Sequence, residues 1–246
     1  MRDSKFVLIL ILGCMTALSP FSIDMYLPSF QNIAADFQTT VAKVSLSLSS
    51  YFVGLSFGQL FYGPLLDRFG RKPPIYVGLA IYILASLLCL LARSTEVLVI
   101  LRFVQAIGGC VVGVGSMAMV RDLFTVKESA KVYSLLILIL GASPLLAPTI
   151  GGLLAASFGW KSVFIALAGM GTTLLLVIHF FLKESHQADL SVSLKVVPIF
   201  KNFIHILKNP VFLTFVSSGA IAFSGLFVCI AGSPVIFLET YKVSAK

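Results

Sequence analysis

The stretch Gly63-Pro64-Leu65-Leu66-Asp67-Arg68-Phe69-Gly70-Arg71-Lys72 decides the fold of this chain. It places four charged side chains within six residues, between the apolar runs Val44–Leu66 and Pro74–Ala92. The core of a soluble protein has no use for such a pattern. A polytopic membrane protein does, because each run can lie in lipid while the loop stays at the charged face of the bilayer. The stretch therefore predicts a tight turn between two membrane-spanning helices.

The composition of the whole chain supports this interpretation. Of the 246 residues, 58% are hydrophobic and 11% are charged, and the mean hydropathy is +1.02. A soluble domain carries about a quarter charged residues. A helix needs about 20 apolar residues to cross a hydrocarbon core of about 30 Å. Seven runs qualify: Phe6–Tyr26, Val44–Leu66, Pro74–Ala92, Val97–Val120, Val132–Phe158, Val163–Leu182 and Val211–Leu238. None alternates like a barrel strand, so the predicted fold class is an all-α integral membrane protein, a helical bundle.

The distribution of basic residues predicts the orientation of the helices. With the amino terminus inside, 12 of the 18 Lys and Arg residues lie in inner segments. Only five lie outside: Lys43, Arg93, Lys161, Lys242 and Lys246. This is the positive-inside bias, and it predicts a multi-pass protein of a bacterial inner membrane with a cytoplasmic amino terminus. The net charge of +8 then reflects topology and the lipid bilayer as partner, and no nucleic acid is expected.

Enzyme and metal signatures are missing from the sequence. Cys14, Cys89, Cys110 and Cys229 lie inside apolar runs without CxxC spacing, so we expect neither disulfides nor a metal site. The chain contains no HExxH, no Walker loop and no GxSxG motif. We therefore predict no enzyme and no cofactor. A transporter of this kind would draw its energy from an ion gradient or from the gradient of its substrate.

The runs divide the chain into three predicted parts. Residues 1–182 hold six runs, 183–210 form the longest polar stretch, and 211–246 hold the seventh run. The end of the second run is echoed at the end of the fifth, where the chain has Gly151-Gly152-Leu153-Leu154 and then Phe158-Gly159-Trp160-Lys161. Three helices separate the two copies, so they point in opposite directions. An inverted repeat of three plus three helices, as in secondary transporters, shows this pattern.

The segment 183–210 is predicted to be a cytoplasmic linker with an amphipathic helix. Its second half interleaves apolar and basic residues: Leu194, Val197, Phe200, Phe203, Ile204 and Leu207 with Lys195, Lys201 and Lys208. This pattern is typical of a helix at the membrane interface, and we expect a break at Pro198. A mobile polar loop is the alternative, but it would not need so many apolar residues.

Two ionisable residues lie well within the runs, Asp24 in the first and Arg102 in the fourth. Each costs about 2.5–3.5 kcal/mol at mid-bilayer on insertion scales, so a functional role is the default hypothesis. The first run leads outward and the fourth leads inward, so the two residues lie at similar depths. An ion pair or a proton-controlled contact is therefore geometrically possible. The alternative is that Asp24 caps the helix end before Pro28 and that Arg102 snorkels outward.

The fifth run contains a second unusual pattern. Pro144 and Pro148 remove two backbone donors and are expected to kink or loosen the helix. Small residues around them, including Gly151 and Gly152, allow a neighbouring helix to approach closely. A bend of this kind suits a carrier whose halves rock against each other. Five further residues are candidates for lining a substrate cavity, with ordinary packing as the alternative for each: Tyr26, Gln59, Tyr62, Gln105 and Met117.

These motifs together resemble the major facilitator superfamily, and within it the drug/proton antiporters of the Bcr/CflA type. Gly63–Lys72 is similar to the signature loop G-x-L-a-D-r-x-G-r-k between spans two and three. Residues 101–108 resemble the span-four motif l-x-x-x-R-x-x-q-G, with Ala106 where Gly is usual. Gly141–Gly152 resembles the span-five antiporter motif, with Ser143-Pro144 for Gly-Pro, and Asp24–Pro28 the acidic motif of span one.

The resemblance implies a twelve-helix carrier with two six-helix domains and a cavity between them. It implies proton-coupled efflux of drugs or other small amphipathic molecules, driven by the proton gradient, with Asp24 and Arg102 as the proton-linked pair. Protonation of Asp24 would weaken its attraction to Arg102 and favour the other-facing state. The resemblance also implies a conformational latch on the inner face, made of Gly63, Asp67, Arg68, Gly70, Arg71, Lys72, Arg121 and Asp122.

The chain departs from the resemblance after the seventh run, where the second six-helix domain is nearly absent. We expect either a truncated product or another chain that supplies the C-terminal half, and no transport by this chain alone. A carrier for a metabolite or a sugar is the alternative function, because the signature loop is shared across the superfamily. A seven-helix receptor is disfavoured, since the seventh run has no lysine for a retinal Schiff base and the loop has no role there.

Overall fold

The computed structural model describes residues 2–235, and all regular secondary structure in this range is helical. The chain divides into two compact units, Met1–Val192 and Ser193–Lys246. Six helical segments are long and apolar enough to cross a membrane, or seven if the bent pair in the second unit counts as one span. The predicted all-α bundle is confirmed.

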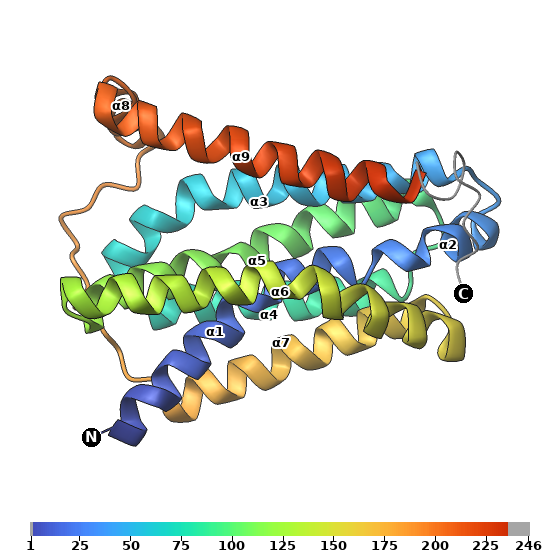
Figure 1. Ribbon diagram of the computed structural model, residues 1–246, viewed down its shortest axis with the longest axis horizontal. Helices are drawn as coiled ribbons and strands as arrows, with labels where there is room; N and C mark the ends of the chain where they lie inside the picture. The colour runs from blue at the N-terminus through green and yellow to red at the C-terminus, as the bar shows by residue number, and fades with distance from the viewer. Residues whose placement is uncertain (1, 236–246) are drawn as a thin grey trace. The chain divides into compact units, whose positions relative to one another are not determined.

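Within its described residues, 2–192, the first unit contains seven α-helices, and Figure 1 shows the long ones running alongside one another. Their bounds follow the predicted runs closely, except that most helices extend beyond the apolar core by a few polar residues. They are α1 Arg2–Asp24, α2 Phe30–Asp36, α3 Val41–Phe69, α4 Lys72–Cys89, α5 Thr95–Leu123, α6 Val126–Phe158 and α7 Lys161–Phe181, with the 3-10 helix η1 Leu27–Ser29 between α1 and α2.

The tight turn predicted between the runs Val44–Leu66 and Pro74–Ala92 is shorter than expected. The helix α3 continues through Pro64 to Phe69, and only Gly70 and Arg71 lie outside helices. Proline is tolerated inside a spanning helix when neighbouring helices hold the segment in place, and α3 packs along α5. Gly70 ends α3 with φ 85° and ψ 175°, a backbone conformation that essentially only glycine adopts. The charged motif is therefore the last turns of α3 followed by a two-residue connection.

The helix α5 lies at the centre of the packing, against α1, α3 and α4. The helix α6 packs on α1, and α7 packs on α4 and on α1. An inverted repeat that matches α1, α3 and α4 with α5, α6 and α7 predicts these pairings: α3 on α5 corresponds to α6 on α1, and α4 on α5 to α7 on α1. The helices α3 and α5 approach each other so closely at Gly54 that a Cβ added there would lie 2.6 Å from the carbonyl oxygen of Phe103.

Polar contacts tie the helices together at both ends of the first unit. At the end that holds the amino terminus, Lys5 Nζ lies 2.7 Å from Glu128 Oε1 at the start of α6. At the opposite end, Trp160 Nε1 donates to Asp36 Oδ2 at 2.9 Å. The chain thus runs from one end to the other with each successive long helix (Figure 1).

The second unit contains α8 Val196–Leu207 and α9 Pro210–Val235. The segments Val197–Leu207 and Pro210–Gly225 meet at 90°. Pro198 does not break α8, because it lies in the first helical turn, where the backbone N–H has no partner within the helix in any case. The predicted run Val211–Leu238 begins within α9, and its last three residues lie outside the described residues.

Candidate functional site

A buried ion-pair cluster lies where α3, α4 and α5 meet. Arg71 Nη1 lies 2.7 Å from Asp67 Oδ1, and Arg71 Nε lies 2.7 Å from Asp122 Oδ2. The exposed fraction of the Arg71 side chain is 2%. Burial acts to lower the pKa of Arg71, but the hydrogen bonds and the negative charges of Asp122 and Asp67 outweigh it, so the pKa lies above its ordinary value. The structure thus brings together three residues of the predicted latch.

The other predicted latch residues do not join this cluster. Arg68 and Lys72 reach backbone carbonyls of the segment that follows α7. Arg121 is exposed, and its side chain makes no ion pair or hydrogen bond within residues 2–235. Gly63 has open space where a Cβ would be, and Gly70 contributes its positive φ angle. Asp67 lies in the last turn of α3, and Arg71 follows Gly70 just beyond the end of that helix, so the two residues are close neighbours along the chain.

Sequence reasoning missed two residues that complete the cluster. The carboxylate of Glu184 accepts hydrogen bonds from the backbone N–H groups of Arg71 and Lys72, and Ser185 Oγ donates to Asp122 Oδ2. Both residues lie a few positions after the end of α7. The one signal that could have found Glu184 is its position as the first acidic residue after a spanning run, opposite the charged loop.

Arg102 is fully buried and is held by polar and aromatic groups. Its Nη2 donates to the carbonyl oxygen of Ser22 at 2.9 Å, and its Nη1 donates to Gln105 Oε1. The guanidinium carbon lies 4.1 Å from the ring centroid of Tyr51 and 4.6 Å from that of Tyr26, distances at which a cation–π interaction is favourable. Gln105 in turn donates to Ser86 Oγ.

Asp24 is 5% exposed and lies at the last residue of α1. Its carboxylate makes no hydrogen bond and no ion pair within the described part of the chain, and the ion pair with Arg102 that similar depth made possible is not formed. The physical reason is that Arg102 turns toward the α1 backbone and the tyrosine rings. The two residues remain linked through α1, because Arg102 contacts Ser22 and Tyr26, two positions before and after Asp24.

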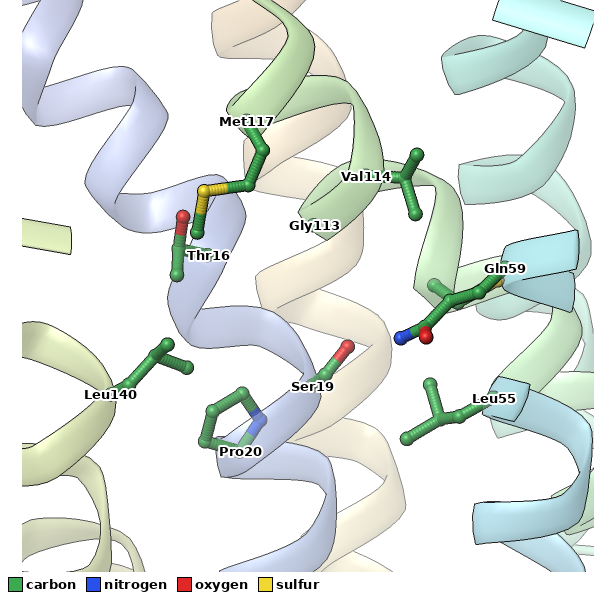
Figure 2. Close-up of a pocket in the computed structure, with 10 residues that line it drawn as sticks. Thr16, Ser19, Pro20, Leu55, Gln59, Gly113, Val114, Met117 and Leu140 are labelled. Atoms are coloured by element: carbon green, nitrogen blue, oxygen red, sulfur yellow. The ribbon is translucent and has the colours of Figure 1, made fainter. Parts of the chain in front are cut away.

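A pocket of about 260 Å³ lies among α1, α3, α5 and α6. Figure 2 shows Gln59 of α3 and Ser19 of α1 pointing into it, with Met117 of α5 and Leu140 of α6 on the other side. Gln59 and Met117 therefore line this pocket. Tyr26, Tyr62 and Gln105 do not line it; their side chains are buried in helix packing.

The helix α6 is continuous through Pro144 and Pro148. Beyond the prolines, α6 approaches the break between α1 and η1 very closely, since a Cβ on Gly151 would overlap the carbonyl oxygen of Met25. A Cβ on Gly152 would lie in ordinary contact with Pro28. The small residues of the predicted span-five motif thus allow close packing of α6 on the segment that follows Asp24.

Comparison with known proteins gives consistent results. The sequence matches the Major Facilitator Superfamily over residues 12–246. It is 35% identical over 242 residues to a bicyclomycin resistance protein homolog of Haemophilus influenzae, covering 98% of this chain and 61% of that protein. It is 36% identical over 222 residues to the multidrug resistance protein MdtL of Escherichia coli O9:H4, covering 90% of this chain and 56% of that protein.

Solved structures show the same fold at lower sequence identity. A bacterial homolog of the human lysosomal transporter Spinster, in an inward-facing and unoccupied conformation, matches with a TM-score of 0.74 at 17% identity. The match covers 99% of this chain and 57% of that one. The chain therefore spans about three fifths of the length of the proteins it matches.

Proposed function

This chain belongs to the major facilitator superfamily, and on that premise we propose that it is part of a proton-coupled exporter of drugs or other small amphipathic molecules. The pocket among α1, α3, α5 and α6 is the observation that carries the proposal. Its walls are largely apolar, with a few polar groups such as Ser19 and Gln59, which is the lining that suits an amphipathic ligand. The names of the two relatives, which refer to bicyclomycin and multidrug resistance, point to the same class of substrate.

In the proposed mechanism, Asp24 takes up and releases the proton, and Arg102 is linked to it through the neighbouring positions Ser22 and Tyr26. A buried carboxylate without a donor has nothing to stabilise its negative charge. Neutralising it changes the charge at the end of α1, the segment that Arg102 holds through Ser22 and Tyr26 and that packs on Gly151 of α6. Protonation thereby biases the packing of α1 on its neighbours, and a bound substrate shifts the same equilibrium in the opposite direction.

The proposal places the chain in a bacterial inner membrane with its amino terminus in the cytoplasm. It follows that the cluster of Asp67, Arg71 and Asp122 lies on the cytoplasmic side and latches that face. The latch, the proton site and the pocket belong to residues 1–182, and the segment 183–210 connects them to a further domain that begins with α9. Transport is proposed for the complete carrier, and we expect none from residues 1–246 alone.

The test uses a fusion of this chain with the C-terminal part of the Haemophilus influenzae relative that lies beyond the matched region. In vesicles with a proton gradient, the fusion should export a fluorescent amphipathic dye, and the Asp24→Asn variant should lose gradient-driven export while inserting normally. Asp36→Asn is the matched control and should keep export, because Asp36 is exposed. Unchanged coupling in Asp24→Asn would refute the proton role.

Two further arms of the same assay test the remaining parts of the proposal. Export by residues 1–246 alone would contradict the requirement for a second domain. Uptake of a sugar or metabolite by the fusion, without effect of any drug, would favour the alternative carrier function.

A further inference from the structure

Two basic residues of the charged loop, Arg68 and Lys72, lie outside the ion-pair cluster and contact the segment that follows α7. Lys72 Nζ donates to the carbonyl oxygen of Leu182 at 2.6 Å, and Arg68 Nη1 donates to the carbonyl oxygens of Leu190 and Val192. The Asp189 N–H donates to the carbonyl oxygen of Asp67 at 3.2 Å. All of these partners lie in residues 182–192, which we call the strap.

The strap also supplies the missing N-terminal cap of α4. This helix begins Lys72-Pro73-Pro74, its N-cap Arg71 has no side-chain cap, and the two prolines have no N–H to donate. The free donors are therefore the N–H groups of Arg71 and Lys72. Glu184 Oε1 lies 2.8 Å from Arg71 N, and Glu184 Oε2 lies 2.9 Å from Lys72 N. A carboxylate at this position satisfies both donors and complements the positive end of the helix dipole.

Two more contacts bring the strap close to the ion-pair cluster. Ser185 Oγ donates to Asp122 Oδ2 at 3.2 Å, so the strap and Arg71 share the same carboxylate. A Cβ added to Gly70 would lie 3.1 Å from Glu184 Oε2 and 3.2 Å from the carbonyl oxygen of His186. The glycine of the loop therefore serves the approach of the strap as well as the positive φ angle.

We propose that residues 182–192 clamp the connection between α3 and α4, and that Glu184 is the positioning residue of this clamp. By capping α4, Glu184 holds the backbone of Arg71 so that its guanidinium faces Asp67 and Asp122. Because Ser185 bonds Asp122 and Glu184 bonds Arg71, any movement that separates Arg71 from Asp122 must also pull on the strap. The strap ends at Val192, the last residue of the first unit, so the state of the cluster is coupled to the segment through which the chain leaves this unit. The inference does not depend on the substrate or on proton coupling.

Hydrogen–deuterium exchange on the purified 246-residue chain in detergent tests this inference. Pro73 and Pro74 carry no amide hydrogen, so a peptide across residues 69–76 reports strongly on Arg71 and Lys72. In Glu184→Ala, we expect exchange at these two amides to accelerate about tenfold or more, because both lose their acceptor. Exchange at Asp189 should accelerate with them if the strap acts as one unit.

Two further variants make the experiment decisive. Glu184→Gln keeps one carbonyl oxygen and should show an intermediate acceleration; it also decides the question if Glu184→Ala does not fold. Glu128→Ala is the matched control, since Glu128 caps α6 within its own helix, and it should leave the 69–76 peptide unchanged. Unaltered exchange at Arg71 and Lys72 in both Glu184 variants would overturn the cap. Acceleration there with no change at Asp189 would overturn the clamp.

Discussion

The helices α3 and α6 both end at a glycine with a positive φ angle, Gly70 with φ 85° and ψ 175° and Gly159 with φ 81° and ψ 164°. The surroundings of the two glycines differ completely. A Cβ on Gly70 would meet Glu184 and His186, whereas a Cβ on Gly159 would have open space within 4 Å. The two helix ends have the same backbone conformation at the glycine. They differ in their charged groups, because Asp67, Arg71 and Glu184 come together only at the end of α3.

The glycines about two turns earlier in each helix show the reverse difference. Gly63 in α3 has open space where a Cβ would lie, whereas Gly151 in α6 lies against the backbone of Met25. The two copies of the repeated sequence, which begin at Gly63 and at Gly151, therefore have different surroundings. The end of α3 leads into a charged connection, and the end of α6 approaches the backbone of Met25 closely.

The largest effect on the free energy of unfolding is expected from breaking the ion-pair cluster, which is present at the end of α3 and not at the end of α6. In Asp122→Ala, the buried guanidinium of Arg71 keeps only Asp67, whose side chain is 44% exposed. We expect the free energy of unfolding to fall by about 3 kcal/mol. The fluorescence of Trp160, the single tryptophan, follows SDS unfolding in mixed micelles. Asp36→Ala removes the polar contact at the opposite end and should cost about 1 kcal/mol, since it removes a single hydrogen bond. Equal losses in the two variants would show that the cluster is not special.

A smaller effect on the free energy of unfolding is expected at Gly151 and Gly63, where the crowded glycine is the one in α6. Gly151→Ala forces a Cβ against backbone atoms of Met25 that cannot move aside, and overpacking of this kind costs about 1–3 kcal/mol. Gly63→Ala has room and should stabilise α3 by about 0.5–1 kcal/mol, because alanine favours a helix more than glycine does. The same unfolding assay measures both variants. A destabilised Gly63→Ala would argue against the open space.

The smallest difference is expected between the two helix-ending glycines. Each substitution to alanine strains a backbone that favours glycine, at a cost of about 1–3 kcal/mol. Gly70→Ala should cost about 1 kcal/mol more than Gly159→Ala, because its Cβ also crowds the carboxylate of Glu184. If Glu184→Ala is added to Gly70→Ala, the excess should disappear. An excess that persists in the double variant would mean that the strap is not its cause.

The pattern of apolar runs predicted the spanning helices of the first unit, because burial in lipid requires long uninterrupted apolar segments. The positions at which the helices begin and end were predicted less accurately. Pro64 and the charges after Leu66 suggested a loop, yet α3 continues to Phe69 since its packing on α5 supports the helix past the proline. At the amino-terminal run, a helix end at Asp24 before Pro28 was one of the two alternatives for Asp24, whereas the 3-10 helix η1 and the short α2 were not predicted.

The site was predicted in part. Asp67, Arg71 and Asp122 do come together, but Asp24 and Arg102 do not form an ion pair even though they were expected at similar depths. Depth follows from counting residues along a helix, whereas contact depends on the rotation of each helix about its axis, which the sequence of one helix does not contain. Arg102 found its partners in Ser22, Gln105 and two tyrosine rings.

By itself the sequence determined that this chain spans a membrane as a bundle of helices, since hydrophobic length and charge placement act locally along the chain. Only the tertiary structure decided that Glu184 caps a helix that starts 112 residues earlier, and that one glycine of each echoed pair is crowded while the other is free. Such contacts join segments that are distant in sequence. Their existence depends on how the helices pack, and no local pattern records it.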